Sequence, residues 1–229
     1  MPLTQLYAST KDSVVQVLAI SGNQVVSAGS GSIIHDGSVV LTCAHCIVAG
    51  AQMAIVDSSA SNRGIFGSVL FTDAQNDVAL LQLSQRVGSP VRFGQSQTCE
   101  PGNGAYVIGF PLNIMERTLL SAHIASASPE RLRIDCSVNH GNSGGPLFNL
   151  RGEQVGVVNS KHGTLSQFLE QVRNAPIGGA ISIGGVDPMQ AIKVLIEEMQ
   201  TNLNLGIGYA IPTAKIKGLH PLLTACVPQ

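Results

Sequence analysis

A single serine stands inside a glycine-rich stretch, "VNHGNSGGPLFNL", at residues 138–150. Ser143 follows Gly141 and Asn142 and precedes two further glycines. Gly, Asn and Ser are turn formers, so one interpretation is a loop that only connects two strands. The other is a nucleophile, because glycines let backbone N–H groups converge beside a hydroxyl as an oxyanion hole. The second interpretation needs a base and an orienting carboxylate elsewhere in the chain.

Among the six histidines, His45 has the context expected of a general base. It follows the apolar run "SVVLT" and lies between small residues in "CAHC", where a strand end would present an imidazole to a cleft. His140 is close to Ser143 in sequence, but three residues along an extended loop do not by themselves bring its ring to that hydroxyl. We therefore predict that His45 is the base.

The carboxylate that would orient this base is sought among Asp57, Asp73, Asp77 and Asp135. Asp77 immediately precedes the apolar run "VALLQL", so its side chain is expected at the edge of the core. An unpaired carboxylate is costly there, and a histidine N–H would satisfy it. A turn at the end of the polar "TDAQN" explains Asp73 better than Asp77. We predict that Asp77 is the orienting carboxylate.

The elements that must position these residues have the pattern of β-strands. From residue 13 to about 160, short apolar runs such as "SVVQVLAI", "AQMAIV" and "AYVIGF" are separated by Gly, Ser, Asn and Asp. This pattern predicts an all-β fold built as an antiparallel barrel or sandwich. We expect the N-terminus to lead directly into a strand. The stretch "GQSQTCEPGNG", residues 94–104, is the expected link between two lobes.

The pattern changes after residue 160. Two stretches, "TLSQFLEQVRNA" and "DPMQAIKVLIEEMQTNL", carry apolar residues at helical spacing, with a glycine-rich connector between them. Asp187 as N-cap and Pro188 at the first helical position mark the start of the second. The chain then returns to a strand at "GIGYAI" and is expected to finish with a short amphipathic helix near "TAKIKGLHPLL".

The composition of the chain limits the kinds of partner that it is expected to bind. The 229 residues can bury a core, as one large unit or two small lobes. Charged residues make up 12% and the formal net charge is −1, so we expect neither nucleic acid nor an anionic membrane as a partner. No run approaches the ~20 apolar residues of a membrane-spanning helix, and the N-terminus lacks the basic region of a signal peptide.

Cysteine usage points to a reducing compartment. Five cysteines, an odd number spread over the chain, do not suggest a disulfide framework. Cys43 and Cys46 have Cys-x-x-Cys spacing, but the second pair of a structural zinc site is absent. We therefore expect free thiols, no metal, no cofactor, and a location in the cytoplasm or another reducing compartment.

The segments "LTCAHC", "NDVALLQL" and "GNSGGPL" occur in the order His, Asp, Ser, and in this the chain resembles the chymotrypsin-like serine peptidases. It is most similar to their HtrA (Deg) branch, where Asn precedes the serine and a "GIGYAIP"-like strand follows the active-site loop. The resemblance spans roughly residues 13–160 and 206–224. It implies two six-stranded antiparallel β-barrels, a lobe at 1–97 and a lobe at 98–229, with a helical insertion at about 161–205 in the second.

The resemblance also implies the roles of individual residues. Ser143 would attack a peptide carbonyl, His45 would accept and return the proton, and Asp77 would hold the imidazole tautomer. The N–H groups of Gly141 and Ser143 would form the oxyanion hole. The expected reaction is therefore hydrolysis of proteins or peptides through an acyl-enzyme.

Residues of the substrate pocket follow from the same resemblance. Ser137 would lie at the floor, Asn159 and Ser160 along one wall, and Gly208 on another. Asp135 corresponds to a structural acidic residue of the branch, so no carboxylate is implied at the floor. We expect cleavage after small or medium apolar residues rather than after Lys or Arg.

The sequence also departs from these relatives. Cys46 has no partner cysteine in "SAGSGSIIHDG", so the disulfide typical of secreted members cannot form. The PDZ domain usual in HtrA enzymes is expected to be missing or encoded elsewhere. The insertion is either a hairpin that packs on the barrel, or a lid, regulatory element or homo-oligomer contact. Two alternatives to a serine endopeptidase stay open: a catalytically idle binding or regulatory module of this fold, and an esterase with the same triad.

Overall fold

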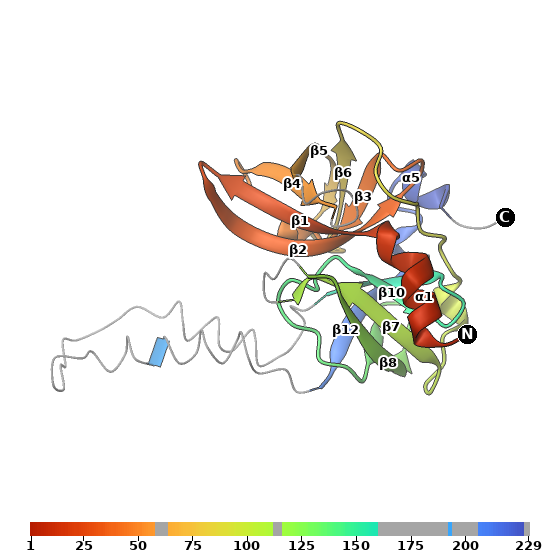
Figure 1. The fold of residues 1–229 in the computed structure, drawn as a ribbon. Helices are drawn as coiled ribbons and strands as arrows, with labels where there is room; N and C mark the ends of the chain where they lie inside the picture. Colours follow the sequence, from red (N-terminus) through yellow and green to blue (C-terminus); the bar gives the residue numbers. More distant parts are fainter. Residues whose placement is uncertain (58–63, 112–115, 160–191, 194–205, 227–229) are drawn as a thin grey trace, which may run out of the picture.

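The short apolar runs form the strands of two closed antiparallel barrels (Figure 1). The structure is a computed structural model that describes residues 1–57, 64–111, 116–159, 192–193 and 206–226. The strand order is β1-β2-β3-β6-β5-β4 in the first barrel and β10-β11-β12-β9-β8-β7 in the second. The predicted all-β class with two six-stranded barrels is therefore confirmed.

The first barrel closes around β-branched and aliphatic side chains. Val15 and Val17 of β1 alternate with outward-facing positions and pack against Ile33, Ile55 and Leu81 in one buried cluster. Its strands are β1 (Val14–Ser21), β2 (Gln24–Ile34), β3 (Val39–Thr42), β4 (Gln52–Val56), β5 (Gly64–Asp73) and β6 (Val78–Leu83).

The second barrel is closed by a strand that follows the long insertion. In β12, Gly208 pairs with Ile134 of β9 and Ala210 pairs with Val158 of β11. This pairing confirms that the chain returns to a strand after the insertion. The strands are β7 (Gly104–Gly109), β8 (Thr118–Ala127), β9 (Leu132–Ile134), β10 (Pro146–Asn149), β11 (Gln154–Val158) and β12 (Gly208–Pro212).

Another buried cluster joins the two barrels. It contains Cys43 and Cys46 from the first barrel together with Tyr106 and Phe148 from the second. The rings of Tyr106 and Phe148 stack with centroids 5.1 Å apart. The turn that carries His45 is therefore anchored in the core between the barrels.

The chain begins with a helix, so the expectation that it enters a strand directly is wrong. Helix α1 (Leu3–Thr10) is followed by the 3-10 turn η1 (Lys11–Ser13), and β1 comes only then. Leu6 is 1% exposed, and the hydroxyl of Thr10 lies 3.3 Å from that of Tyr106 in β7. So short a helix gains most of its stability from tertiary packing rather than from propensity.

The C-terminal part carries two very short helices, not one. Helix α4 (Thr213–Ile216) ends before α5 (Pro221–Thr224) begins. Pro221 has no N–H for a continuous helix, but it suits a first helical position. The side chain of His220 caps α5 by accepting a hydrogen bond from the Leu222 N–H.

The connection between the barrels runs over residues 84–103 and contains the 3-10 turn η3 (Ser96–Thr98). It already contacts the second barrel at Phe93, which forms an isolated parallel bridge with Gln154. The insertion expected at about 161–205 lies outside the described residues, apart from residues 192 and 193. None of the helices in the described part of the chain has the length and apolar character needed to cross a lipid bilayer.

Candidate active site

Two buried cysteines hold the turn that presents His45. The 3-10 turn η2 (Ala44–Cys46) follows β3, and the exposed fractions of Cys43 and Cys46 are 0% and 3%. The Cys43 thiol donates to the carbonyl oxygen of Val158 over 3.3 Å. Because both cysteines are fixed in the core between the barrels, the His45 ring has little freedom to move away from its place beside them.

His45 and Asp77 are joined by two hydrogen bonds. The Nδ1 of His45 lies 2.7 Å from Oδ2 of Asp77, and the backbone N–H of His45 donates to Oδ1 over 2.9 Å. Asp77 has a φ of 53°, a left-handed conformation that is uncommon for residues other than glycine. The strained backbone and the paired contacts together aim the carboxylate at the imidazole.

Asn159 completes the surroundings of this carboxylate, although the sequence predicted it in the substrate pocket. Its Nδ2 donates to Oδ2 of Asp77 over 2.7 Å, and the residue is 1% exposed. The side chain therefore lies on Asp77 rather than along an open pocket wall. The sequence held no local signal for this contact because the two residues are 82 positions apart.

The pair has shifted pKa values. Burial favours the neutral forms of both groups, but the hydrogen bonds and charge interaction with His45 outweigh it and lower the pKa of Asp77. Burial likewise opposes protonation of His45. The hydrogen bonds to Asp77 and Cys46, with the charge interactions of both, nevertheless raise the pKa of His45 to about 9. The carboxylate thus favours an imidazolium beside it.

The loop around Ser143 bends toward the His45 turn. Gly141 and Gly144 have φ values of 92° and 84°, which glycine adopts without the steric cost of a Cβ. The carbonyl of Ser143 accepts a hydrogen bond from the backbone N–H of Ser30 over 2.8 Å, and its oxygen lies 3.7 Å from Sγ of Cys46. The structure therefore places Ser143 next to the residue that follows His45.

The remaining predicted pocket residues are only partly brought together. The space beside Gly208 is filled by the carbonyl of Cys136 and the side chain of Val138, the two neighbours of Ser137. Ser137 itself is exposed. Ser137 and Gly208 are thus close to each other, whereas Ser160 lies outside the described residues.

Two of the other acidic candidates, Asp135 and Asp73, have partners outside the His45–Asp77 pair. Asp135 is exposed, and its Oδ1 accepts a hydrogen bond from the backbone N–H of His123. Its Oδ2 lies 3.1 Å from Nδ1 of the same histidine. The carboxylate of Asp73 accepts from the backbone N–H groups of Gln75 and Asn76 in a turn. Both arrangements are those of structural carboxylates, as the sequence suggested.

Cys43, His45 and Asp77 also have the side-chain types of a metal site. Their potential ligand atoms lie within 4.8 Å of one another. However, Nδ1 of His45 and Oδ2 of Asp77 face each other at hydrogen-bond distance. An ion bound by these atoms would have to replace that hydrogen bond, so the geometry fits an oriented imidazole better than a metal centre.

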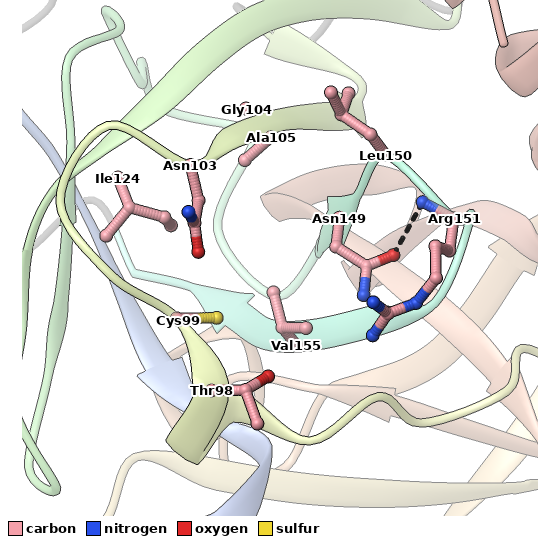
Figure 2. Close-up of a pocket in the computed structure, with 10 residues that line it drawn as sticks. All are labelled: Thr98, Cys99, Asn103, Gly104, Ala105, Ile124, Asn149, Leu150, Arg151 and Val155. Atoms are coloured by element: carbon pink, nitrogen blue, oxygen red, sulfur yellow. Dashed lines mark hydrogen bonds between the residues drawn. The ribbon is translucent and has the colours of Figure 1, made fainter.

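A cavity of about 270 Å³ is lined by residues of the second barrel and of the connection that leads to it (Figure 2). Cys99, Leu150 and Val155 are among its lining residues, and no predicted site residue is. Figure 2 shows the Oδ1 of Asn149 accepting the backbone N–H of Arg151, which fixes the turn at one side of this cavity.

Sequence similarity covers most of the two barrels. A trypsin-like peptidase domain model matches residues 29–157. The chain is 34% identical over 149 residues to "Putative protease Do-like 14" of Arabidopsis thaliana, covering 57% of this chain and 35% of that protein. It is 29% identical over 203 residues to "Probable periplasmic serine endoprotease DegP-like" of Pseudomonas fluorescens, covering 83% of this chain and 42% of that protein. The chain therefore spans less than half the length of these relatives.

Solved structures share the fold. The crystal structure of the serine endoprotease from Yersinia pestis superposes with a TM-score of 0.69 at 24% identity, covering 98% of this chain and 67% of that chain. The HtrA-type protease AlgW with tripeptide superposes with a TM-score of 0.66 at 20% identity, covering 93% and 60%. At these identities the likeness extends to the two-barrel architecture.

Proposed function

The chain belongs to the trypsin-like peptidase family, and on this basis we propose that it is a serine endopeptidase that acts on proteins. Ser143 is the nucleophile, His45 is the general base and Asp77 orients the imidazole. The observation that carries the proposal is the 2.7 Å contact between Nδ1 of His45 and Oδ2 of Asp77, with Cys46, the residue after His45, in contact with the backbone carbonyl of Ser143. A binding module would need no such oriented imidazole.

The reaction uses each of these groups in turn. With Nδ1–H held by Asp77, Nε2 of His45 takes the proton of the Ser143 hydroxyl as its Oγ attacks the peptide carbonyl. The N–H groups of Gly141 and Ser143 stabilise the oxyanion. His45 then gives the proton to the leaving amine, and a water activated by the same base hydrolyses the acyl-enzyme.

We further propose cleavage after small or medium apolar residues. The proximity of Ser137 and Gly208 supports this preference, because neither residue supplies a charge for a Lys or Arg side chain. Asp135 is turned toward His123. Matched peptide amides with Val, Leu, Lys or Arg before the scissile bond test the idea. We expect higher kcat/KM for Val and Leu, and a preference for Lys or Arg would contradict it.

A location in a reducing compartment is also a proposal. All five cysteines are free thiols, and Cys43 and Cys46 lie in the core that joins the barrels. The DegP-like relative of Pseudomonas fluorescens is described as periplasmic. Fractionation of cells that make the protein separates the possibilities: we expect it in the cytoplasm or another reducing compartment, and recovery in an oxidising compartment such as the periplasm would contradict this proposal.

Digestion of an unfolded protein tests the proposed activity. Purified wild type should cleave β-casein into peptides, and Ser143→Ala should lower the rate on the order of a million-fold. An ester and an amide with the same acyl group, assayed side by side, separate a peptidase from an esterase. An inactive wild-type protein would favour the idle-module alternative, and an active Ser143→Ala variant would exclude Ser143 as nucleophile.

A further inference from the structure

Ser30 links the first barrel to both halves of the proposed active site. It lies in β2 and has an exposed fraction of 0%. Its N–H donates to the Ser143 carbonyl over 2.8 Å, and its hydroxyl donates to the Gly141 carbonyl over 2.6 Å. The same hydroxyl oxygen accepts the Phe110 N–H over 2.9 Å, and the Ser30 carbonyl accepts from the Thr42 hydroxyl over 2.8 Å. All its polar groups are thus engaged.

The contacts of Ser30 reach opposite sides of the site. Thr42 ends β3, the strand that leads into the His45 turn. Gly141 and Ser143 belong to the loop whose N–H groups are proposed to receive the oxyanion. One buried residue therefore fixes the spacing between the strand that presents the base and the loop that presents the nucleophile.

Ser32 offers a matched comparison for Ser30 on the same strand face. It lies two residues further along β2, on the same face, and is also 0% exposed. Its hydroxyl has no hydrogen-bond partner among the residues that the structure describes. The two serines are thus matched in strand and burial but differ in what their hydroxyls bind.

The oxyanion loop has backbone freedom that such an anchor would restrict. Gly141 has a φ of 92°, and glycine can leave this conformation at little steric cost. The carbonyl of Gly141 shares a planar peptide with the N–H of Asn142, so turning this carbonyl away from Ser30 would change ψ of Gly141 and φ of Asn142. These dihedrals set the path of the loop from which the N–H groups of Gly141 and Ser143 project. Oxyanion donors act only when aimed at the developing charge.

We propose that Ser30 is a positioning residue that holds the oxyanion loop in its working conformation through the hydroxyl contact to Gly141. This inference rests on the proposed serine endopeptidase function. The hydrogen bonds of the Ser30 hydroxyl go to the backbone of Gly141 and Phe110. Its effect should therefore appear in stabilisation of the transition state, not in the ionisation of His45.

Four variants test the role: Ser30→Ala, which removes the hydroxyl; Ser30→Cys, which keeps a weak donor; Ser32→Ala, the matched control; and Ser143→Ala. Each is assayed with one peptide amide for kcat and KM, and with the matching peptide boronic acid for inhibition. The boronic acid forms a tetrahedral adduct that uses the oxyanion hole. Circular dichroism and thermal melting show the temperature range in which each variant is folded, and the assays stay within it.

Ser30→Ala should lower kcat about 10- to 100-fold with little change in KM, because misplaced oxyanion donors act mainly on the transition state. Affinity for the boronic acid should fall by a similar factor. The kcat of Ser30→Cys should lie between those of Ser30→Ala and wild type. If Ser30→Ala does not fold, Ser30→Cys takes its place in the test. Ser32→Ala should match wild type, and the pH at which kcat/KM is half-maximal should be the same in all active variants.

Three results would overturn the inference. The first is a wild-type kcat in Ser30→Ala, or in Ser30→Cys if only that variant folds. The second is a loss of kcat in Ser32→Ala equal to that in Ser30→Ala, and the third is a lower kcat in Ser30→Ala with unchanged affinity for the boronic acid. The failure of the proposed function looks different. An inactive wild type, or an active Ser143→Ala variant, would reject the peptidase mechanism itself. An active wild type with an unaffected Ser30→Ala would reject only the role of Ser30.

Discussion

The side-chain amide of Asn159 donates a 2.7 Å hydrogen bond to the carboxylate of Asp77. Asn159 directly follows β11 of the second barrel, whereas Asp77 directly precedes β6 of the first. The carboxylate that orients the base is thus held from both barrels at once. A change in how the barrels pack would alter this contact, and with it the position of the carboxylate that orients His45.

Removing that contact should weaken catalysis. Asn159→Ala takes away one donor from a charged acceptor, and such hydrogen bonds are worth about 1.5–3 kcal/mol, so we expect a loss of roughly 10-fold or more in kcat/KM. Asn159→Asp should lose more, because a second carboxylate would repel the first. Steady-state kinetics at one pH measures both. Equal activity in all three proteins would show that Asp77 does not depend on Asn159.

Asp77→Asn should lower kcat by roughly 10⁴ while leaving the fold intact, because an amide at this position favours the wrong tautomer of His45. Asp73→Asn is the matched control. Asp73 lies in the same turn but contacts Gln75 and Asn76, and an Asn oxygen can still accept from their N–H groups. Kinetics with melting curves would check this. Comparable losses in the two variants would contradict the assignment.

Activity should rise with pH over an unusually alkaline range. A histidine with its ordinary pKa of ~6.5 would lose activity below about pH 6 to 7. In the structure the pKa of His45 is raised to about 9, and only the neutral imidazole can act as base. The rise in kcat/KM should therefore be centred above pH 6.5, toward pH 9.

A pH profile of kcat/KM for wild type and Asp77→Asn measures this shift. The residual activity of Asp77→Asn should rise at lower pH than that of wild type, because the carboxylate that stabilises the imidazolium is gone. A wild-type profile centred at or below pH 6.5 would contradict the prediction.

Helix α1 should contribute measurably to stability. Leu6 is buried in the cluster that joins the barrels, so Leu6→Ala should lower the free energy of unfolding by about 2–5 kcal/mol. Gln5→Ala, on the exposed side of the same helix, should change it by less than about 0.5 kcal/mol. Urea denaturation of the two variants compares them. An equal midpoint for Leu6→Ala and wild type would mean that the helix is not firmly packed.

The strands and the His45–Asp77 pair could be predicted because their signals are local. Short β-branched runs between turn residues indicate strands, and Asp77 stands directly before such a run. Helix α1 had a local signal too, since Leu3, Leu6, Tyr7 and Thr10 have helical spacing. The helix packs on the barrels through contacts such as that of Thr10 with Tyr106, which is 96 positions away and which the pattern does not reveal.

Contacts across the two barrels were not predictable from the sequence. Asn159 was expected in the substrate pocket from the family resemblance, whereas its hydrogen bond to Asp77 depends on how the barrels meet. The same holds for Ser30, whose partner Gly141 is 111 residues away. Burial lowers the pKa of His45, and the raised value arises from the hydrogen bonds and charge interactions of Asp77 and Cys46, which outweigh burial and are assembled only in the folded chain.

The central claim is that Ser143 is a nucleophile activated by His45. The most direct measurement is the rate of covalent labelling by a fluorophosphonate, followed by intact-protein mass spectrometry and peptide mapping. We predict one adduct per wild-type chain, located on Ser143, no adduct in Ser143→Ala, and much slower labelling in His45→Ala. Wild-type protein that stays unlabelled, or that is labelled equally fast without His45, would contradict the claim.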